Sequence, residues 1–425
     1  MMVLGISCRA ILFSSLGALA CSAAGCGASA NDTGPDLAGA SPETTAQVDR
    51  LSIQDDKILA PDGTEIQLRG WNWGQWNTIL AGDLFPDYPG SRRNDPSDGA
   101  DTAAQGGNVV RILLRWWGEY GTDNDNMDRF GLPIDSRDEV NGTAHVSKKA
   151  LRLLDDMITE ATSHGLWVDL AVDSNCGQDS PSDADLYCSE GGKPHRNFNN
   201  DSVMKDEFKA IWTYLADTYR NHDHIGMYEI LPEPQFGCST GAKDCDYVAT
   251  RAFYTELIGT IRNEDHRTPI LIGPGSGYAM KHIADAFIED DGNTMQVIYT
   301  ANMLSTEARS MDDLLAFTQF RSDRHVPVYV QQVGIVQSDV KDMAGNLDPV
   351  AYRADVVSVL SELDRDNIGW TWWTYREQKP NSDGYAPWFL AAPPDTWSAA
   401  VTPEMLTTIT TYFHTVIPAG ARPDR

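Results

Sequence analysis

Basic side chains are scarce in this sequence of 425 residues. It has 33 lysines and arginines against 61 aspartates and glutamates, which gives a formal net charge of −28 at pH 7. A field of that sign repels phosphate backbones and anionic lipid head groups, so we expect no nucleic-acid partner. The same charge favours solubility and does not discourage a neutral polymer as a ligand.

Long apolar runs are lacking as well. The run from Ala10 to Ala20 follows Arg9 and is too short to cross a bilayer as a stable helix, but it is typical of a secretory signal. Cys21 and Cys26 each follow small residues, as the lipidated cysteine of a bacterial lipoprotein does. We therefore expect residues 1–26 to be a lipoprotein-type signal with Cys26 lipidated, and plain secretion stays open. The protein would then be exported to the outer surface or periplasm of a bacterium, and it would touch a membrane only through this lipid.

Cysteine is rare, with seven residues in the whole chain. Four remain after the signal is removed: Cys176, Cys188, Cys238 and Cys245. An even number in an exported protein suggests two disulfides, and Cys176–Cys188 with Cys238–Cys245 is the simplest of three pairings. A zinc site is the alternative, but these spacings are not those of CxxC pairs and no histidine completes them, so we expect no metal.

A Gly-rich phosphate-binding loop is also absent after the first expected strand, which argues against an open, doubly wound sheet. Residues 27–48 are rich in Ala, Ser, Thr, Gly, Asp and Pro and are predicted to be a flexible linker. Residues 49–418 are predicted to form a single domain. It begins with a β-hairpin over residues 51–68, whose turn we place at Pro61-Asp62-Gly63.

Short apolar runs then alternate with amphipathic helical patterns. The expected strands are residues 67–71, 109–114, 167–172, 225–231, 270–272, 297–301, 328–330 and 369–373. The clearest helical patterns are residues 148–164, 204–220, 247–262 and 349–363. Nearly continuous apolar strands indicate a parallel sheet covered by helices, and eight of them favour a closed α/β structure, the (β/α)8 or TIM barrel.

In such a barrel the active site lies at the C-terminal ends of the strands. The strand ends of this chain carry Arg111, the pair Glu233-Pro234, Gly334 and Trp373, in that order. Together they resemble glycoside hydrolase family 5, a cellulase-like family of retaining enzymes built on this barrel. The resemblance covers residues 50–417.

The resemblance implies a chemistry based on two glutamates, one after strand 4 and one after strand 7. One protonates the glycosidic oxygen and the other attacks the sugar, which gives retention of configuration. Glu233 then resembles the general acid/base. The alignment on Gly334 places Gln332 at the position of the nucleophile. A carboxamide is uncharged and almost non-nucleophilic, so it cannot form the glycosyl-enzyme intermediate. No cofactor is implied.

Other strand ends depart from the family as well. Pro232 replaces the Asn before the acid/base, Asn302 lies near the position of a strand-6 His, Leu304 lies near that of a Tyr, and Asp173 follows strand 3 without the expected His. The residues that we expect to bind substrate are Arg111, Trp76, Asn302, Tyr299 and Trp373. Other tryptophans that could stack on sugar rings are Trp73, Trp116, Trp117 and Trp388.

The resemblance thus predicts a monomeric, exported protein that engages a β-linked oligosaccharide or polysaccharide, with weak or absent hydrolysis. Three alternatives stay open: an inverting glycosidase that uses another carboxylate such as Asp173 or Glu377, a non-catalytic carbohydrate-binding protein of the cell surface, and a barrel reused as a protein-interaction module. Family membership favours an enzyme, whereas Gln332 favours binding without cleavage.

Overall fold

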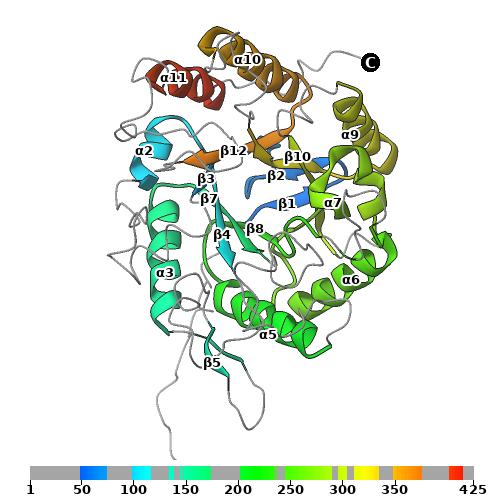
Figure 1. Ribbon diagram of the computed structural model, residues 1–425. Coiled ribbons are helices and arrows are strands. Elements are labelled where there is room, and N and C mark those ends of the chain that lie inside the picture. The colour runs from blue at the N-terminus through cyan, green and yellow to red at the C-terminus, as the bar shows by residue number, and fades with distance from the viewer. Residues whose placement is uncertain are drawn as a thin grey trace, which may run out of the picture. The chain divides into compact units, whose positions relative to one another are not determined.

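The computed structural model places the C-terminal part of the chain, Val48–Arg425, in one compact unit (Figure 1). The residues that the structure describes are 48–73, 98–115, 134–137, 144–146, 148–173, 202–234, 236, 245–289, 295–303, 311–334, 348–375 and 402–414.

Eight parallel strands close into a barrel in the order β10-β11-β12-β3-β4-β7-β8-β9. The strands are β3 (Arg69–Trp73), β4 (Val109–Arg115), β7 (Trp167–Asp173), β8 (Ile225–Glu229), β9 (Ile270–Ile272), β10 (Val297–Met303), β11 (Val328–Val333) and β12 (Gly369–Tyr375). Each overlaps one of the eight predicted runs, and β9 has the predicted bounds. The predicted (β/α)8 barrel is confirmed.

Helices surround the barrel (Figure 1). They are α2 (Asp98–Ala104), α3 (Lys148–Ser163), α5 (Ser202–Tyr219), α6 (Tyr247–Glu264), α7 (Gly275–Tyr278), the 3-10 helix η3 (Met280–Ala286), α9 (Met311–Arg324), α10 (Pro349–Arg365) and α11 (Thr402–Phe413). A separate antiparallel pair consists of β5 (Ile134–Arg137) and β6 (Ala144–Val146). In the part of the chain that the structure describes, no helix has both the length and the apolar character needed to cross a membrane.

Local sequence signals explain where two of these helices begin. Asp348 precedes α10, and its carboxylate accepts hydrogen bonds from the backbone N–H groups of Val350 and Ala351. Pro349 occupies the first helical position, where its missing N–H costs nothing. Asp246 caps α6 in the same way through the N–H of Ala249.

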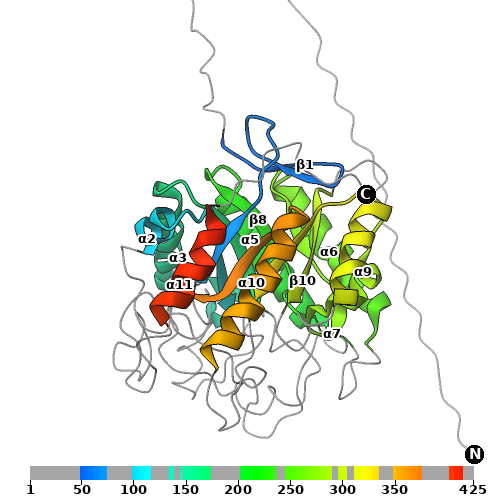
Figure 2. The ribbon, with the colours of Figure 1, turned by 90° about the horizontal axis from the view of Figure 1, so that it is seen from above.

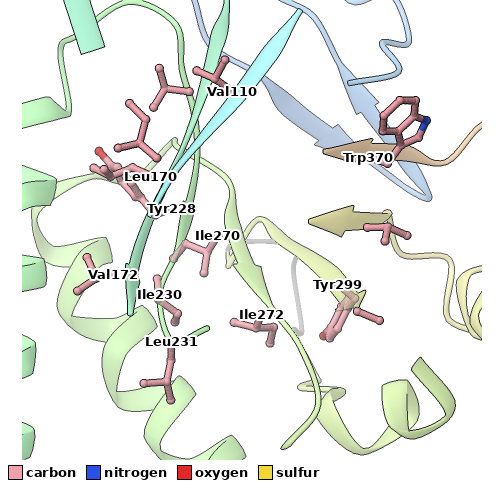
Figure 3. Packing of buried hydrophobic residues seen from close by; sticks show 14 of the residues in the cluster. Val110, Leu170, Val172, Tyr228, Ile230, Leu231, Ile270, Ile272, Tyr299 and Trp370 are labelled. Atoms are coloured by element: carbon pink, nitrogen blue, oxygen red, sulfur yellow. The ribbon is translucent and has the colours of Figure 1, made fainter. Parts of the chain in front are cut away.

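Side chains alternate between two cores along each strand. On β4, Val110 and Ile112 point outward and pack under the helices, whereas Val109 points into the barrel. This period of two is that of an extended strand. Figure 3 shows part of the outer core, including Val110 and Leu170.

An N-terminal hairpin, β1 (Ser52–Gln54) and β2 (Lys57–Leu59), closes one end of the barrel (Figure 2). Leu51, Ile53 and Ile58 pack against the first inward side chains of the strands. The hairpin is confirmed, but an earlier turn within it was not predicted. The chain already reverses at Asp55, which has the left-handed φ of 53°, and the predicted turn at Pro61-Asp62-Gly63 is a second, longer reversal that ends in a bridge from Leu59 to Glu65.

Gly70 lies where β3 and β4 meet, and a Cβ atom at this residue would stand 1.7 Å from the carbonyl oxygen of Val109. The strands would have to separate to admit a methyl group. We expect Gly70→Ala to destabilise the full chain by about 3 kcal/mol or more, measured by urea unfolding.

Gly259→Ala is the matched control. Gly259 lies within α6, and its added Cβ would meet no atom within 4 Å. Alanine is the better helix former, so this variant should be more stable by about 0.5–1 kcal/mol. Equal stability of Gly70→Ala and the native chain would refute the close approach of β3 and β4.

Candidate active site

Above the apolar layer at the hairpin end, the barrel interior becomes polar. Val109, Trp167, Met227 and Tyr329 line the apolar layer. Two residues further along each of these strands the inward side chains are Arg111, Asp169, Glu229 and Gln331, and β3 adds Asn72. All five are at most 1% exposed.

Arg111 binds its neighbours on three strands. Its Nε donates to Glu229 Oε2 at 2.5 Å, its Nη1 donates to Asn72 Oδ1 at 2.8 Å, and Asp169 Oδ2 lies 3.9 Å from Nε. Burial alone would favour a neutral guanidinium, but the carboxylates of Glu229 and Asp169 outweigh it and raise the pKa of Arg111 above its ordinary value. The guanidinium therefore stays charged and holds β3, β4 and β8 together.

Glu233 lies four residues beyond the end of β8, at the mouth of the barrel. Its backbone has a φ of 48°, a left-handed conformation that non-glycine residues rarely adopt and that occurs at functional sites. Its Oε1 accepts a hydrogen bond of 2.5 Å from Nδ2 of Asn302, which stands near the end of β10. The carboxylate is partly exposed, while Asn302 is 3% exposed.

Strand β11 is irregular where it reaches this mouth. Val330 and Val333 both pack in the outer core, and the register with β12 shifts between them. In a regular strand one inward-facing residue lies between two outward-facing ones. Here two residues, Gln331 and Gln332, lie between Val330 and Val333, and one extra residue defines a β-bulge. Bulges of this kind change the direction of side chains beside active sites.

Gln331 is the buried member of this pair, and Gln332 is partly exposed. Nε2 of Gln331 donates to Oδ1 of Asn302. The Gln331 carbonyl accepts hydrogen bonds from Asn72 Nδ2 at 3.0 Å and from the Thr371 hydroxyl. The backbone of the bulge is therefore tied to β3 and β12, and its side chain is tied to the partner of Glu233.

A partly exposed carboxylate with amide partners, at the C-terminal ends of barrel strands, has the position of an active site in this fold. Residues 59–379 of the chain match the family model described as Cellulase (glycosyl hydrolase family 5). The chain belongs to glycosyl hydrolase family 5.

Two curated relatives of this family 5 chain match most of its length. Endoglucanase C of Evansella cellulosilytica is 24% identical over 373 residues, which are 79% of this chain and 42% of that protein. A beta-xylosidase of Phanerodontia chrysosporium is 22% identical over 77% of this chain and 71% of its own. The chain thus spans less than half of the first of these relatives.

Solved structures share the family 5 fold. Pseudomonas stutzeri endoglucanase Cel5A has a TM-score of 0.55 at 15% identity, over 84% of this chain and 97% of its own. XacCel5A, solved in complex with cellopentaose, has a TM-score of 0.56 at 15% identity, over 82% of this chain and 99% of its own. Similarities at this level of identity establish the barrel alone.

Several of the predicted site residues meet at the mouth of this family 5 barrel. Glu233 contacts Asn302 directly, and Asn302 pairs in register with Gln332. Trp373 follows the inward-facing Thr371 by two positions, whereas its neighbours Trp370 and Trp372 pack in the outer core. The alternation of β12 therefore places Trp373 on the inward side.

Other predictions about the site need correction. Tyr299 points away from the barrel interior, because the inward positions of β10 are Ile298, Thr300 and Asn302. Its ring packs against Phe287 and Phe320, and its hydroxyl bonds the backbone of Ile288.

Trp73 likewise belongs to the outer core, so it is no stacking platform, and its indole N–H donates to Thr102. Arg111 was expected to bind substrate. It is 1% exposed and pairs with Glu229 instead, below the mouth.

Some predictions fall outside the residues that the structure describes. They concern Cys26, Trp76, Trp116, Trp117, Cys176, Cys188, Cys238, Leu304, Glu377 and Trp388, together with the side chain of Asp173. Cys245 forms a disulfide, but its pairing with Cys238 stays a prediction. Among the described residues, no group of three or more His, Cys, Asp or Glu side chains is placed to hold a metal ion.

Sequence reasoning missed three members of the site. Glu229 was not predicted as a site residue, although it follows Met227 by two positions on β8 and so faces inward. Asp169 carries a similar signal, since a charged residue inside an apolar run must face a partner. Gln331 carried no signal beyond its neighbour Gln332, because a bulge has no sequence pattern of its own.

Asp169 is the least satisfied of the buried groups. Neither of its carboxylate oxygens has a hydrogen-bond partner within the described part of the chain. Burial, and then the negative charge of Glu229, raise the pKa of Asp169 well above its ordinary value. Burial also raises the pKa of Glu229, against the pull of Arg111.

Asp169 therefore makes the stability of the barrel depend on pH. Because its pKa is raised in the folded state, its contribution is fully present below about pH 4 and is lost as the pH rises through the folded pKa. We expect Asp169→Asn, which keeps the shape and removes the charge, to be more stable than the native chain at pH 7, because the folded state disfavours the ionised form of this acid. The gain should shrink as the pH approaches 4, in urea unfolding followed between pH 4 and 8.

Asp156→Asn on the exposed face of α3 is the matched control. It should change stability by less than about 0.5 kcal/mol at each pH. A loss of stability in Asp169→Asn at pH 7 would mean that the ionised carboxylate supports Arg111 and would contradict the prediction.

Proposed function

We propose that this family 5 protein binds a β-linked polysaccharide at the mouth of the barrel and hydrolyses it slowly or not at all. The observation that carries the proposal is that carboxamide side chains, and no carboxylate, stand at the end of β11. Glu233 faces Asn302, and the residues beyond Asn302 are Gln331 and Gln332. The match of Gly334 to the strand-7 motif of the family supports the assignment of Gln332 to the position of the nucleophile.

Retaining hydrolysis needs two carboxyl groups about 5–5.5 Å apart, one as acid and one as nucleophile. Glu233 can serve as the first. A carboxamide at the second position cannot attack the anomeric carbon and stabilises an oxocarbenium ion poorly. The chemistry would therefore stop at binding, or proceed slowly through another route.

The other inward carboxylates of the described residues do not replace the nucleophile. Glu229 and Asp169 are both 0% exposed, and Glu229 is bonded to Arg111. Neither is open to a sugar at the mouth. An inverting route through Asp173 or Glu377 remains the alternative to binding without cleavage.

The names of the relatives suggest which polymers to try first. Endoglucanase C and the cellopentaose complex of XacCel5A point to β-glucans, and the beta-xylosidase points to xylan. We propose that the protein acts outside the cytoplasm, as an exported lipoprotein or a secreted protein, as a monomer and without a cofactor. A lipid on Cys26 would keep the bound polymer near the cell.

The decisive comparison is between the native chain and Gln332→Glu on a panel of β-glucans, mannans and xylans. We expect the native chain to bind at least one polymer with little turnover. The variant should release reducing sugar more than about a hundredfold faster, because a restored nucleophile should lower the barrier by roughly 3 kcal/mol or more. Reducing-sugar release and binding isotherms are the measurements.

Gln319→Glu on α9 makes the same chemical change at an exposed position away from the mouth and should leave both measurements unchanged. Rapid turnover by the native chain would rule out the binding-only function. If Gln332→Glu folds and binds but stays inactive, the replacements at Pro232 and Asn302 limit catalysis as well.

A further inference from the structure

The side chains of Glu233, Asn302 and Gln331 form a chain of hydrogen bonds from the mouth into the barrel. An ionised carboxylate only accepts hydrogen bonds, whereas a carboxamide donates through nitrogen and accepts through oxygen. The amide nitrogen of Asn302 must therefore face Glu233, and its oxygen must face Gln331. That oxygen needs a donor, which Nε2 of Gln331 provides.

Gln331 is well placed to impose this direction. It is 0% exposed, and its backbone N–H donates to the Thr300 hydroxyl at 3.2 Å. Its carbonyl is held by Asn72 and Thr371. The other end of its amide, Oε1, is buried without a hydrogen-bond partner in the described part of the chain. The residue thus leaves one buried acceptor unsatisfied while it donates to Asn302, and leaving a buried acceptor without a partner costs free energy.

We propose that Gln331 is a positioning residue. It orients the Asn302 amide toward Glu233 and so holds Glu233 as a hydrogen-bond acceptor at the mouth. A carboxylate held by a donor in this way is fixed in direction at the mouth and can accept a hydrogen bond from a hydroxyl group there. The positioning role needs no ligand. The further step, that this acceptor binds a sugar hydroxyl, rests on the proposed function.

The alternative residues at this position show why a carboxamide matters. A carboxylate at position 331 would accept from Asn302 and turn its amide over, so that Oδ1 would face Glu233. Two acceptors would then oppose each other. A methionine would fill the space but would remove the donor that Gln331 provides to Asn302. A donor at position 331 that is directed at Oδ1 favours the direction found here.

Thermal unfolding of the full chain tests this direction without any ligand. Gln331→Glu should lower the Tm by about 3 °C or more, because the Asn302 oxygen is set against Glu233. Glu233→Gln alone should change the Tm little, since its own amide oxygen still accepts from Asn302. In the double variant the Gln at 233 can turn and donate to the reversed Asn302, so most of the loss should be recovered.

Relief of charge repulsion could produce a similar rescue, and Gln332→Glu separates the two explanations. It adds the same charge at the adjacent residue, whereas the bond to Asn302 Oδ1 comes from Gln331. Glu233→Gln should rescue Gln331→Glu clearly more than it rescues Gln332→Glu. Rescue of equal size in both backgrounds, or no rescue of Gln331→Glu, would overturn the proposal. A merely structural role of Gln331 predicts additive losses.

Titration with cellohexaose and xylohexaose then tests the role of the oriented carboxylate in binding. Gln331→Glu should weaken the binding of the preferred hexasaccharide about tenfold, and the double variant should regain part of it. If the Tm rescue occurs but the native chain binds neither sugar nor any polymer of the panel, the proposed function fails and the positioning role stands. If the native chain binds and Gln331→Glu binds equally well, the positioning role of Gln331 in binding is overturned.

Discussion

The ion pair between Arg111 and Glu229 is the constraint on which the interior of this barrel depends. A charge buried at the centre of a domain is tolerated only if it is paired and hydrogen-bonded, and Arg111 has Glu229 at 2.5 Å and Asn72 at 2.8 Å. Asn72 in turn binds the carbonyl of Gln331. The position of the mouth therefore depends on the Arg111 guanidinium. Through Asn72, the charged layer fixes the backbone of Gln331 at the end of β11.

That layer also explains why ionised Asp169 lowers the stability of the folded state. One cation faces two carboxylates, and the pair nearest in space takes the hydrogen bonds. Burial and the charge of Glu229 raise the pKa of the remaining acid, so its ionised form is disfavoured inside the barrel. A barrel interior must be filled with side chains, and here it is filled with groups whose charges nearly but not fully balance.

The architecture was predictable because it follows from patterns repeated along the chain. Eight apolar runs separated by amphipathic helices admit few arrangements, and a strand such as residues 270–272 is recognised from composition alone. The hairpin turn was not, since Asp55 adopts a left-handed conformation without a glycine to signal it, whereas Pro61-Asp62-Gly63 carries a stronger local pattern. Tyr299 was misjudged because its chemistry suits sugar binding, but the alternation of β10 turns it outward. The role of Gln331 depends on a bulge and on the direction of a neighbouring amide, and both arise only from tertiary contacts.

The hairpin that closes the barrel has a consequence for the order of folding. Its residues come first in the domain, yet several of their partners come from far along the chain. The backbone N–H of Ile53 donates to the side chain of Gln296, and Asp56 is held by Arg321. These contacts span more than 240 residues. A chain emerging from the ribosome or from a translocation pore, N-terminus first, cannot close this end until the seventh strand of the barrel is about to appear. The hairpin therefore reaches its final position late in folding, as expected for a topology in which many contacts join residues far apart in the sequence.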